Sequence, residues 1–336
     1  MKQAIHDFPD HLAEAQKLCQ GFTLASKTVN KIVIFGMGGS AIGGDLAGAV
    51  CDQAGALPVH VIRNEVIPHW IDEQTFVIAV SYSGNTQETL SAFESALARR
   101  PNGAAVITTG GKLKAIAGSR NIPCLEIPGG LMPRAGLAFT FVPILHFVSQ
   151  IAKLPAQAFN LTDAIEVLKQ MRDKLSASNS DAQSLAKSIH GKFPLIYAPT
   201  PAFMPAARRW KCQINENAKQ PAAFEVFPEL CHNEIVGFTQ SLPIHKSLAA
   251  ILLRDDEEPS NVRKRIDTTR DILKESGTFL HEITSQGKTF LSRLLSFCYD
   301  ADWVSLYLAE ENKVDPIPIA VIDRLKAEME PGFSKK

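Results

Sequence analysis

The sequence has no excess of charge of either sign, because 35 Lys and Arg residues are balanced by 35 Asp and Glu residues. This balance provides no basic surface for nucleic acid and no attraction to an anionic membrane, so neither partner is expected. The most apolar stretch, residues 137–151, is interrupted by Thr140, Pro143 and His146, and is read as a buried helix rather than a membrane span. The N-terminus carries no apolar signal segment, and we therefore expect a cytoplasmic protein.

The sequence also lacks the usual signatures of a metal centre or a disulfide framework. Its six cysteines are scattered, contain no Cys-x-x-Cys pair, and are expected to be buried free thiols. Its nine histidines show no metal-ligand spacing such as His-x-x-x-His with a third partner. The sequence therefore predicts no bound metal.

Two short Gly- and Ser-rich segments each follow a β-branched apolar run and lead into a helical pattern. GMGGSAIGGD (residues 36–45) follows the expected strand 31–35, and SYSGNT (residues 81–86) follows the expected strand 76–80. Such a junction can hold a phosphate, because glycines admit the backbone, helix-start N–H groups point at the anion, and hydroxyls donate hydrogen bonds. The second segment has more hydroxyls than glycines, which favours a small phosphorylated metabolite over a nucleotide.

The length of 336 residues fits two domains, which we place at residues 1–155 and 156–336. Alternating strand-like runs and helical patterns predict an α/β fold with a doubly wound parallel sheet. In the first half, the expected strands are 31–35, 59–63, 76–80, 104–109 and 124–127, after a helix over 11–19. An apolar helix over 133–154 and a polar helical region over 162–190 come next. The second half repeats the pattern with strands 194–198, 247–254 and 279–283 and helices 205–219, 288–311 and 319–329, without a phosphate loop.

Six segments in this order resemble a known family. The two Gly- and Ser-rich segments resemble the sugar isomerase (SIS) domain, which implies two tandem SIS-type αβα sandwich domains. The bifunctional phosphoglucose/phosphomannose isomerase family, which has two SIS domains, is the narrower resemblance, and it covers residues 30–327. It rests on MPRAG (132–136), NENAK (215–219), CHNEIVG (231–237), and VDPIP (314–318) followed by IDRLK (322–326).

The resemblance implies a cofactor-independent aldose–ketose isomerase that interconverts fructose 6-phosphate with glucose 6-phosphate and mannose 6-phosphate. It also implies a homodimer in which the neighbouring subunit supplies His232. By the same resemblance, Glu216 transfers the proton, His232 and Lys326 open the sugar ring, and Arg134 lies beside the reacting carbons. The phosphate would be held by Ser40, Ser81, Ser83 and Thr86 with the backbone of Gly38 and Gly39.

The chemistry of these residue types agrees with such a reaction. One carboxylate can move a proton between adjacent carbons through an enediol(ate), and an arginine can stabilise the negative oxygen that develops. Each residue also has a structural reading, since Ser40 could cap a helix and His232 could be a capping or core histidine. Glu216 lies off the apolar stripe of its helix, as a solvent-facing glutamate would, and Lys326 alone reads as a surface lysine.

Three other functions remain open at this level. A dinucleotide-binding oxidoreductase would explain GMGGSA, but Arg63 and Asn64 follow the second strand where an acidic residue is expected. A non-catalytic SIS sensor would need the phosphate loops but not Glu216, His232 or Lys326. A single-SIS isomerase of another sugar phosphate would not need the second half.

Two positions depart from the family pattern. Relatives commonly carry Thr where this chain has Ile317, and Tyr where it has Phe139. If the Thr hydroxyl helps the site to accept either epimer at C2, its absence lowers the activity on mannose 6-phosphate.

Overall fold

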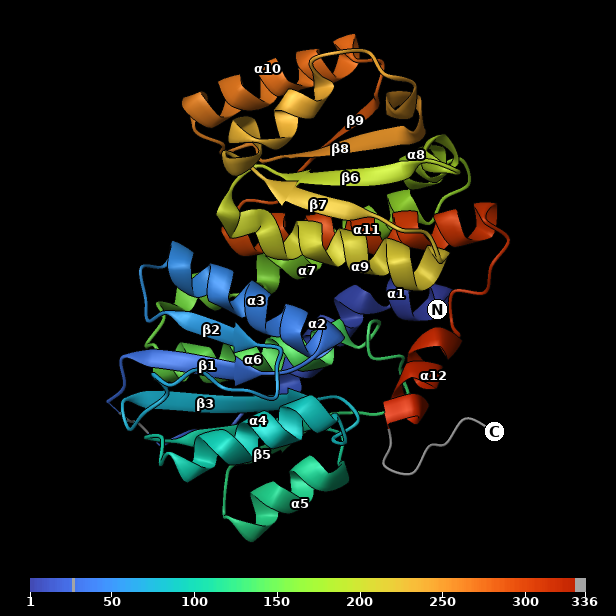
Figure 1. Cartoon of the computed structure of the whole chain (residues 1–336). Helices are drawn as coiled ribbons and strands as arrows, with labels where there is room; N and C mark the ends of the chain where they lie inside the picture. The colour runs from blue at the N-terminus through green and yellow to red at the C-terminus, as the bar shows by residue number, and fades with distance from the viewer. Residues whose placement is uncertain (26–27, 330–336) are drawn as a thin grey trace.

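The computed structural model describes residues 1–25 and 28–329, and contains two parallel sheets that lie one above the other (Figure 1). In the first sheet the spatial order is β2-β1-β3-β4-β5, with the order reversing between β1 and β3. Its strands are β1 (Lys31–Phe35), β2 (Val59–Ile62), β3 (Thr75–Ser81), β4 (Ala104–Thr108) and β5 (Cys124–Glu126). All of its pairings are parallel.

The second sheet repeats this topology with one strand fewer. In the order β7-β6-β8-β9 the strands take the same places, by chain order, as the first four strands of the other sheet. These strands are β6 (Phe193–Ala198), β7 (Ala223–Val226), β8 (Leu248–Arg254) and β9 (Phe279–Thr284). The predicted fold class, two doubly wound α/β units in tandem, is therefore confirmed.

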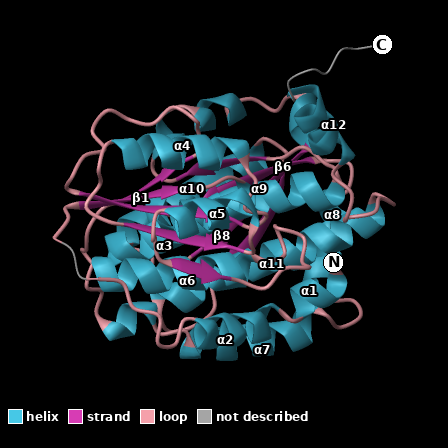
Figure 2. Ribbon diagram, turned by 90° about the horizontal axis from the view of Figure 1, so that it is seen from below, coloured by secondary structure: helices cyan, strands magenta, loops and turns pink. Residues whose placement is uncertain are grey.

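Helices cover both faces of each sheet (Figures 1 and 2). In the first half they are α1 (Lys2–His6), α2 (Phe8–Leu18), α3 (Gly38–Gln53), α4 (Gln87–Ala98), α5 (Gly111–Ser119) and α6 (Leu137–Ile151). In the second half they are α7 (Thr162–Leu175), α8 (Asp181–Ile189), α9 (Met204–Ala218), α10 (Ser260–Glu275), α11 (Phe290–Glu311) and α12 (Ala320–Met329). Among the described residues no helix is both long and apolar enough to cross a membrane.

The helices between the two sheets form one shared core. Alternate residues of a strand point to opposite faces of the sheet, so β1 contributes to two cores. Ile32 and Ile34 pack on the central helices, whereas Val33 and Phe35 pack against α4 and α5 on the outer face. The central core continues through α9 and α11 to the inner face of the second sheet, and α10 covers the outer face. The two halves are thus joined by a continuous apolar layer.

Some predicted elements were wrong in detail. The helix expected from residue 133 begins at Leu137, because residues 132–136 form a hydrogen-bonded turn. The polar region 162–190 is two helices, since Asn179 adopts a positive φ of 59° and Ser180 caps α8. Two further elements, β7 and α10, were not predicted from the sequence. β7 has only four residues, too few to show a clear alternation of apolar and polar side chains. The division into residues 1–155 and 156–336 stays a prediction.

Candidate active site

The first Gly-rich segment forms the junction between β1 and α3. Gly38 has a positive φ of 51°, and α3 begins at this residue. At Gly39 a Cβ atom would lie 2.8 Å from the carbonyl oxygen of Pro133, so only glycine lets the two backbones approach. Ser40, three residues into the helix, is buried. The helix start is therefore packed directly against the turn that carries Arg134.

The second segment forms the junction between β3 and α4. Ser81 is buried, and its hydroxyl lies 2.9 Å from the hydroxyl of Thr86 and accepts a hydrogen bond from the Gly84 N–H. Gly84 has a φ of 70°, and a Cβ there would overlap the Gly110 carbonyl. Ser83 is exposed at the tip of the loop. Its oxygen accepts a hydrogen bond of 3.2 Å from the backbone N–H of Asn85.

The sheet places these two junctions side by side. β1 and β3 are neighbours in parallel register, with Phe35 opposite Ala79, so both loops leave the same carboxyl edge. This is also the point where the strand order reverses, the place where open α/β sheets bind ligands. All six residues predicted to hold the phosphate therefore belong to two adjacent loops: Gly38, Gly39, Ser40, Ser81, Ser83 and Thr86.

Arg134 is almost completely buried, with 4% of its side chain exposed, and is not the solvated helix-start arginine that its position in the sequence allows. Its Nε donates to Asn217 Oδ1 at 2.7 Å, and its Nη2 donates to the carbonyl oxygens of Pro316 and Ile317. Nη1 lies 3.6 Å from Glu216 Oε2. Burial lowers the pKa of the guanidinium, and the negative charge of Glu216 opposes that shift.

Glu216 lines a cavity of about 690 Å³ between the C-terminal end of α9 and the start of α12. Its side chain is 29% exposed, so the carboxylate is open to the cavity. The same carboxylate lies close to Arg134. Lys219, which also lines the cavity, ends α9 in a left-handed conformation with φ of 55°. Burial and the charge of Arg134 lower the pKa of Lys219. The cavity wall thus carries Glu216 and Lys219, and the buried Arg134 lies beside the carboxylate.

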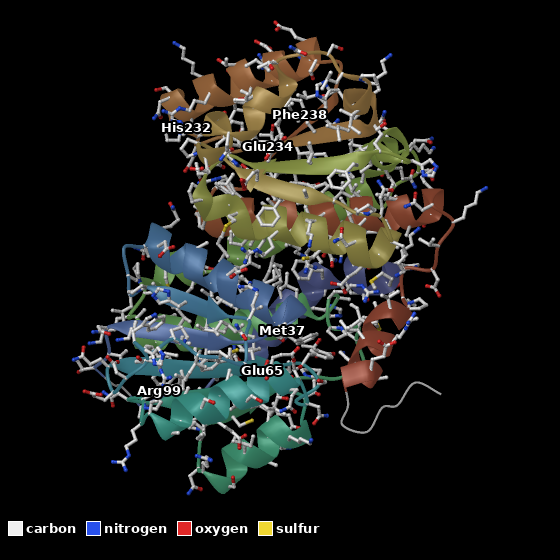
Figure 3. All side chains as sticks on the ribbon, in the orientation of Figure 1. Met37, Glu65, Arg99, His232, Glu234 and Phe238 are labelled. Atoms are coloured by element: carbon white, nitrogen blue, oxygen red, sulfur yellow. The ribbon has the colours of Figure 1, made fainter. Side chains whose placement is uncertain are left out.

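His232 lies apart from this group. It is an exposed residue at the end of the short helix Glu229–His232, which follows β7. In Figure 3, His232 is at the upper left, beside one end of the second sheet, whereas Met37, which belongs to the first Gly-rich segment, lies in the lower half. A single chain therefore does not bring His232 to the loops.

Lys326 is exposed on α12, whose first residues line the cavity. This helix lies at the edge of the molecule in both ribbon views (Figures 1 and 2). Ile317 lies just before α12 and is 44% exposed. Its carbonyl oxygen accepts a hydrogen bond from Arg134.

Sequence reasoning assigned no role to Asn217 and Lys219, although both lie within the NENAK segment that carries Glu216. A signal was present for Asn217, because it follows Ile214 by three residues on the apolar stripe of its helix, and a buried Asn must find hydrogen-bond partners. Their partners come from α11 and from residue 316, far away in the sequence, so the signal could not show what they contact.

The end of β2 does not resemble a dinucleotide site. Arg63 stands where an acidic residue would bind the ribose, and it contacts the carboxylate of Asp45 on α3. Arg208 of α9 binds the same carboxylate at 2.9 Å. This acidic residue is therefore occupied in joining α3 to β2 and α9.

Comparison with known proteins finds relatives that match most of the chain. The bifunctional phosphoglucose/phosphomannose isomerase of Caldicellulosiruptor bescii is 37% identical over 334 residues, which cover 97% of this chain and 98% of that protein. The chain belongs to the bifunctional phosphoglucose/phosphomannose isomerase family. The enzyme of the same name from Aquifex aeolicus is 35% identical over 89% of this chain and 90% of its own length.

Two further comparisons support the family and its fold. The model of the bacterial phospho-glucose isomerase C-terminal SIS domain matches residues 178–329. The crystal structure of a hypothetical protein from Thermus thermophilus superposes with a TM-score of 0.75 at 17% identity, over 98% of this chain and 91% of that one. Membership of this isomerase family replaces the oxidoreductase interpretation of the Gly-rich loop.

Proposed function

We propose that this protein interconverts fructose 6-phosphate with glucose 6-phosphate and mannose 6-phosphate by proton transfer through an enediol(ate). The proposal is supported above all by the Glu216 carboxylate, which lines the cavity and lies 3.6 Å from the buried guanidinium of Arg134. A base beside a fixed cation is what moving a carbonyl between C1 and C2 requires.

In this mechanism Glu216 removes the proton from C2 of the open-chain aldose. The C2–H electron pair forms the C1–C2 double bond, and the former carbonyl oxygen becomes negative or takes a proton. The protonated Glu216 then returns the proton to C1, and the C2 hydroxyl proton passes to the negative oxygen on C1, which leaves a carbonyl at C2 and a hydroxyl at C1. Glucose and mannose 6-phosphates give the same enediol(ate), because they differ only at the carbon that loses the proton.

Arg134 stabilises the oxygen that becomes negative, and its charge persists at any working pH. The phosphate is held at the start of α3 and by the hydroxyls of the second loop, so that remote binding energy positions the sugar. Lys326 and His232 protonate and deprotonate the ring oxygen and the C1 hydroxyl, which opens the cyclic sugar.

We also propose that the active form is a homodimer and that His232 reaches the site of its neighbour. This arrangement is supported by the exposure of His232 and by its distance from the phosphate loops within one chain (Figure 3). The cytoplasmic location expected from the sequence and the absence of a required cofactor are parts of the same proposal.

The decisive experiment is an isomerase assay of the purified, EDTA-treated protein on fructose 6-phosphate, with glucose 6-phosphate and mannose 6-phosphate measured separately. We expect both products. Glucose 6-phosphate alone would restrict the proposal and would implicate Ile317. No product together with tight binding of the sugar phosphate would overturn the enzyme in favour of a sensor.

The shared site has its own test. Glu216→Gln and His232→Ala proteins are each expected to be inactive, but hybrids formed by mixing them restore one complete site. Random exchange of two subunits should therefore recover about a quarter of wild-type activity. If mixing under conditions that exchange subunits recovers none, His232 acts within its own chain, and if His232→Ala is active by itself, His232 has no role.

A further inference from the structure

The buried guanidinium of Arg134 is held by neutral acceptors. Its Nε and Nη2 donate to the amide oxygen of Asn217 and to the carbonyl oxygens of Pro316 and Ile317. The carboxylate of Glu216, at 3.6 Å, is beyond good hydrogen-bond distance. The positive charge is therefore fixed in place without being closely paired, and remains available to a reacting oxygen.

A chain of donors determines which way the Asn217 amide points. Ser305 of α11 donates its single proton to the carbonyl oxygen of Asp302 at 3.0 Å, so its oxygen can only accept from Asn217. The Nδ2 of Asn217 lies 2.9 Å from that oxygen. The amide oxygen must then face Arg134, and both Asn217 and Ser305 are fully buried, which prevents water from replacing either bond.

The backbone of Arg134 is tethered to the same turn of α11. Arg209 donates from Nη2 to the carbonyl oxygen of Arg134 at 3.1 Å and to Asp302 Oδ2 at 2.8 Å. The other oxygen of Asp302 accepts from Gln213 at 2.7 Å. One turn of α11 thus supports both the main chain and the side chain of Arg134.

We propose that Asn217 is a positioning residue whose neutral amide, oriented by Ser305, aims the Arg134 guanidinium at the reacting oxygen without neutralising it. This inference rests on the proposed function, because it assigns Asn217 a role through Arg134. An aspartate at position 217 would keep an acceptor at Nε but would place a full negative charge closer to Arg134 than Glu216 is. A fixed counter-charge at that distance weakens the stabilisation of an enediolate.

The test compares Asn217→Asp with Asn312→Asp. Asn312 is a matched control because its amide also joins α11 to the end of α9, at the Ala218 carbonyl, but does not contact Arg134. We expect Asn217→Asp to lower kcat by roughly ten- to a hundredfold with KM changed less than about threefold, as for an interaction made only in the transition state. Asn312→Asp should retain wild-type kcat in its folded fraction.

A folded Asn217→Asp protein with wild-type kcat, or one in which only KM changes, would overturn the proposal. If this variant does not fold, Ser305→Ala tests the same idea, because it frees the amide to rotate without adding charge. Its kcat should fall several-fold at constant KM, and an unchanged kcat would count against the orienting chain.

Arg134→Gln separates this inference from the function on which it rests. If Arg134→Gln retains normal kcat, the assignment of Arg134 fails. If Arg134→Gln is impaired while folded Asn217→Asp is not, only the role of Asn217 is refuted.

Discussion

Replacing Glu216 with Gln tests the centre of the mechanism, because the amide keeps the shape of the side chain and removes the base. Glu216 is 29% exposed and lies 3.6 Å from Arg134, so the substitution breaks no close hydrogen bond to it. The free energy of unfolding should change by no more than about 0.5 kcal/mol, as at surface positions. A loss of activity would then not reflect unfolding.

The expected effect on turnover is much larger. A positioned acid–base group contributes roughly 10²–10⁴ to the rate, which corresponds to about 3–5 kcal/mol of the activation barrier. Substrate affinity should stay near normal, because the phosphate loops and Arg134 remain. The expected pattern is therefore a large fall in kcat with a nearly constant dissociation constant for glucose 6-phosphate.

Three measurements check this prediction. A coupled dehydrogenase assay gives kcat, calorimetric titration gives the affinity, and NMR in deuterated water follows exchange of the sugar C2 proton. Glu275→Gln, an exposed position on α10, is the matched control and should be unchanged. Turnover of Glu216→Gln within tenfold of wild type, or persistent C2 exchange, would refute the assignment of Glu216 as the base.

Three further predictions concern the loops, the buried ion pair and a buried acid. Ser83→Ala should raise KM for fructose 6-phosphate roughly tenfold with little change in kcat, since it removes one donor to the phosphate; an unchanged KM in steady-state kinetics would argue against the clamp. Asp302→Asn should lower the free energy of unfolding by about 3–5 kcal/mol in urea titrations, because it leaves Arg209, only 2% exposed, as an uncompensated charge. Burial and, to a lesser degree, Asp181 raise the pKa of Asp300 from 3.8 to about 8, so its protonated form favours the folded state. Wild type should therefore lose stability relative to Asp300→Asn as the pH rises from about 4 to about 8, and parallel melting temperatures of the two proteins over that range would contradict this.

The two Gly- and Ser-rich loops could be predicted from the sequence because each is a local signal. A β-branched run, a Gly- or Ser-rich turn and a helical pattern are contiguous in GMGGSA and SYSGNT, and the backbone conformation of glycine depends mainly on its neighbours. The parallel register of β1 and β3 then brings the loops together, as the alternation of strands and helices predicts.

The residue at which α6 begins could not be predicted from the sequence in the same way. Residues 133–136 are compatible with a helix, but contacts from distant parts of the chain hold them in a turn. Gly39 packs on the carbonyl of Pro133, and the side chain of Arg134 is bound by Asn217 and by residues 316–317. Local propensity cannot show such contacts.

The roles of single charged residues depended most on tertiary structure. Glu216 off the apolar stripe of its helix looks in the sequence like any exposed glutamate, and Arg134 looks like a solvated arginine. These two residues are 82 positions apart in the chain. They lie close together because α9 packs against both α11 and the turn at 132–136. Only the resemblance to a family suggested these residues before the structure did.

The sequence by itself determined the two αβ units, the two Gly- and Ser-rich loops and the end of the sheet at which they lie, because these follow from hydrophobic periodicity and glycine. The tertiary structure decided that Arg134 is buried beside Glu216, that Asn217 and Ser305 hold it through neutral bonds, and that His232 lies away from the loops of its own chain. The difference is physical: periodicity and turns depend on neighbours in the chain, whereas the position and environment of a charge depend on which distant residues pack around it.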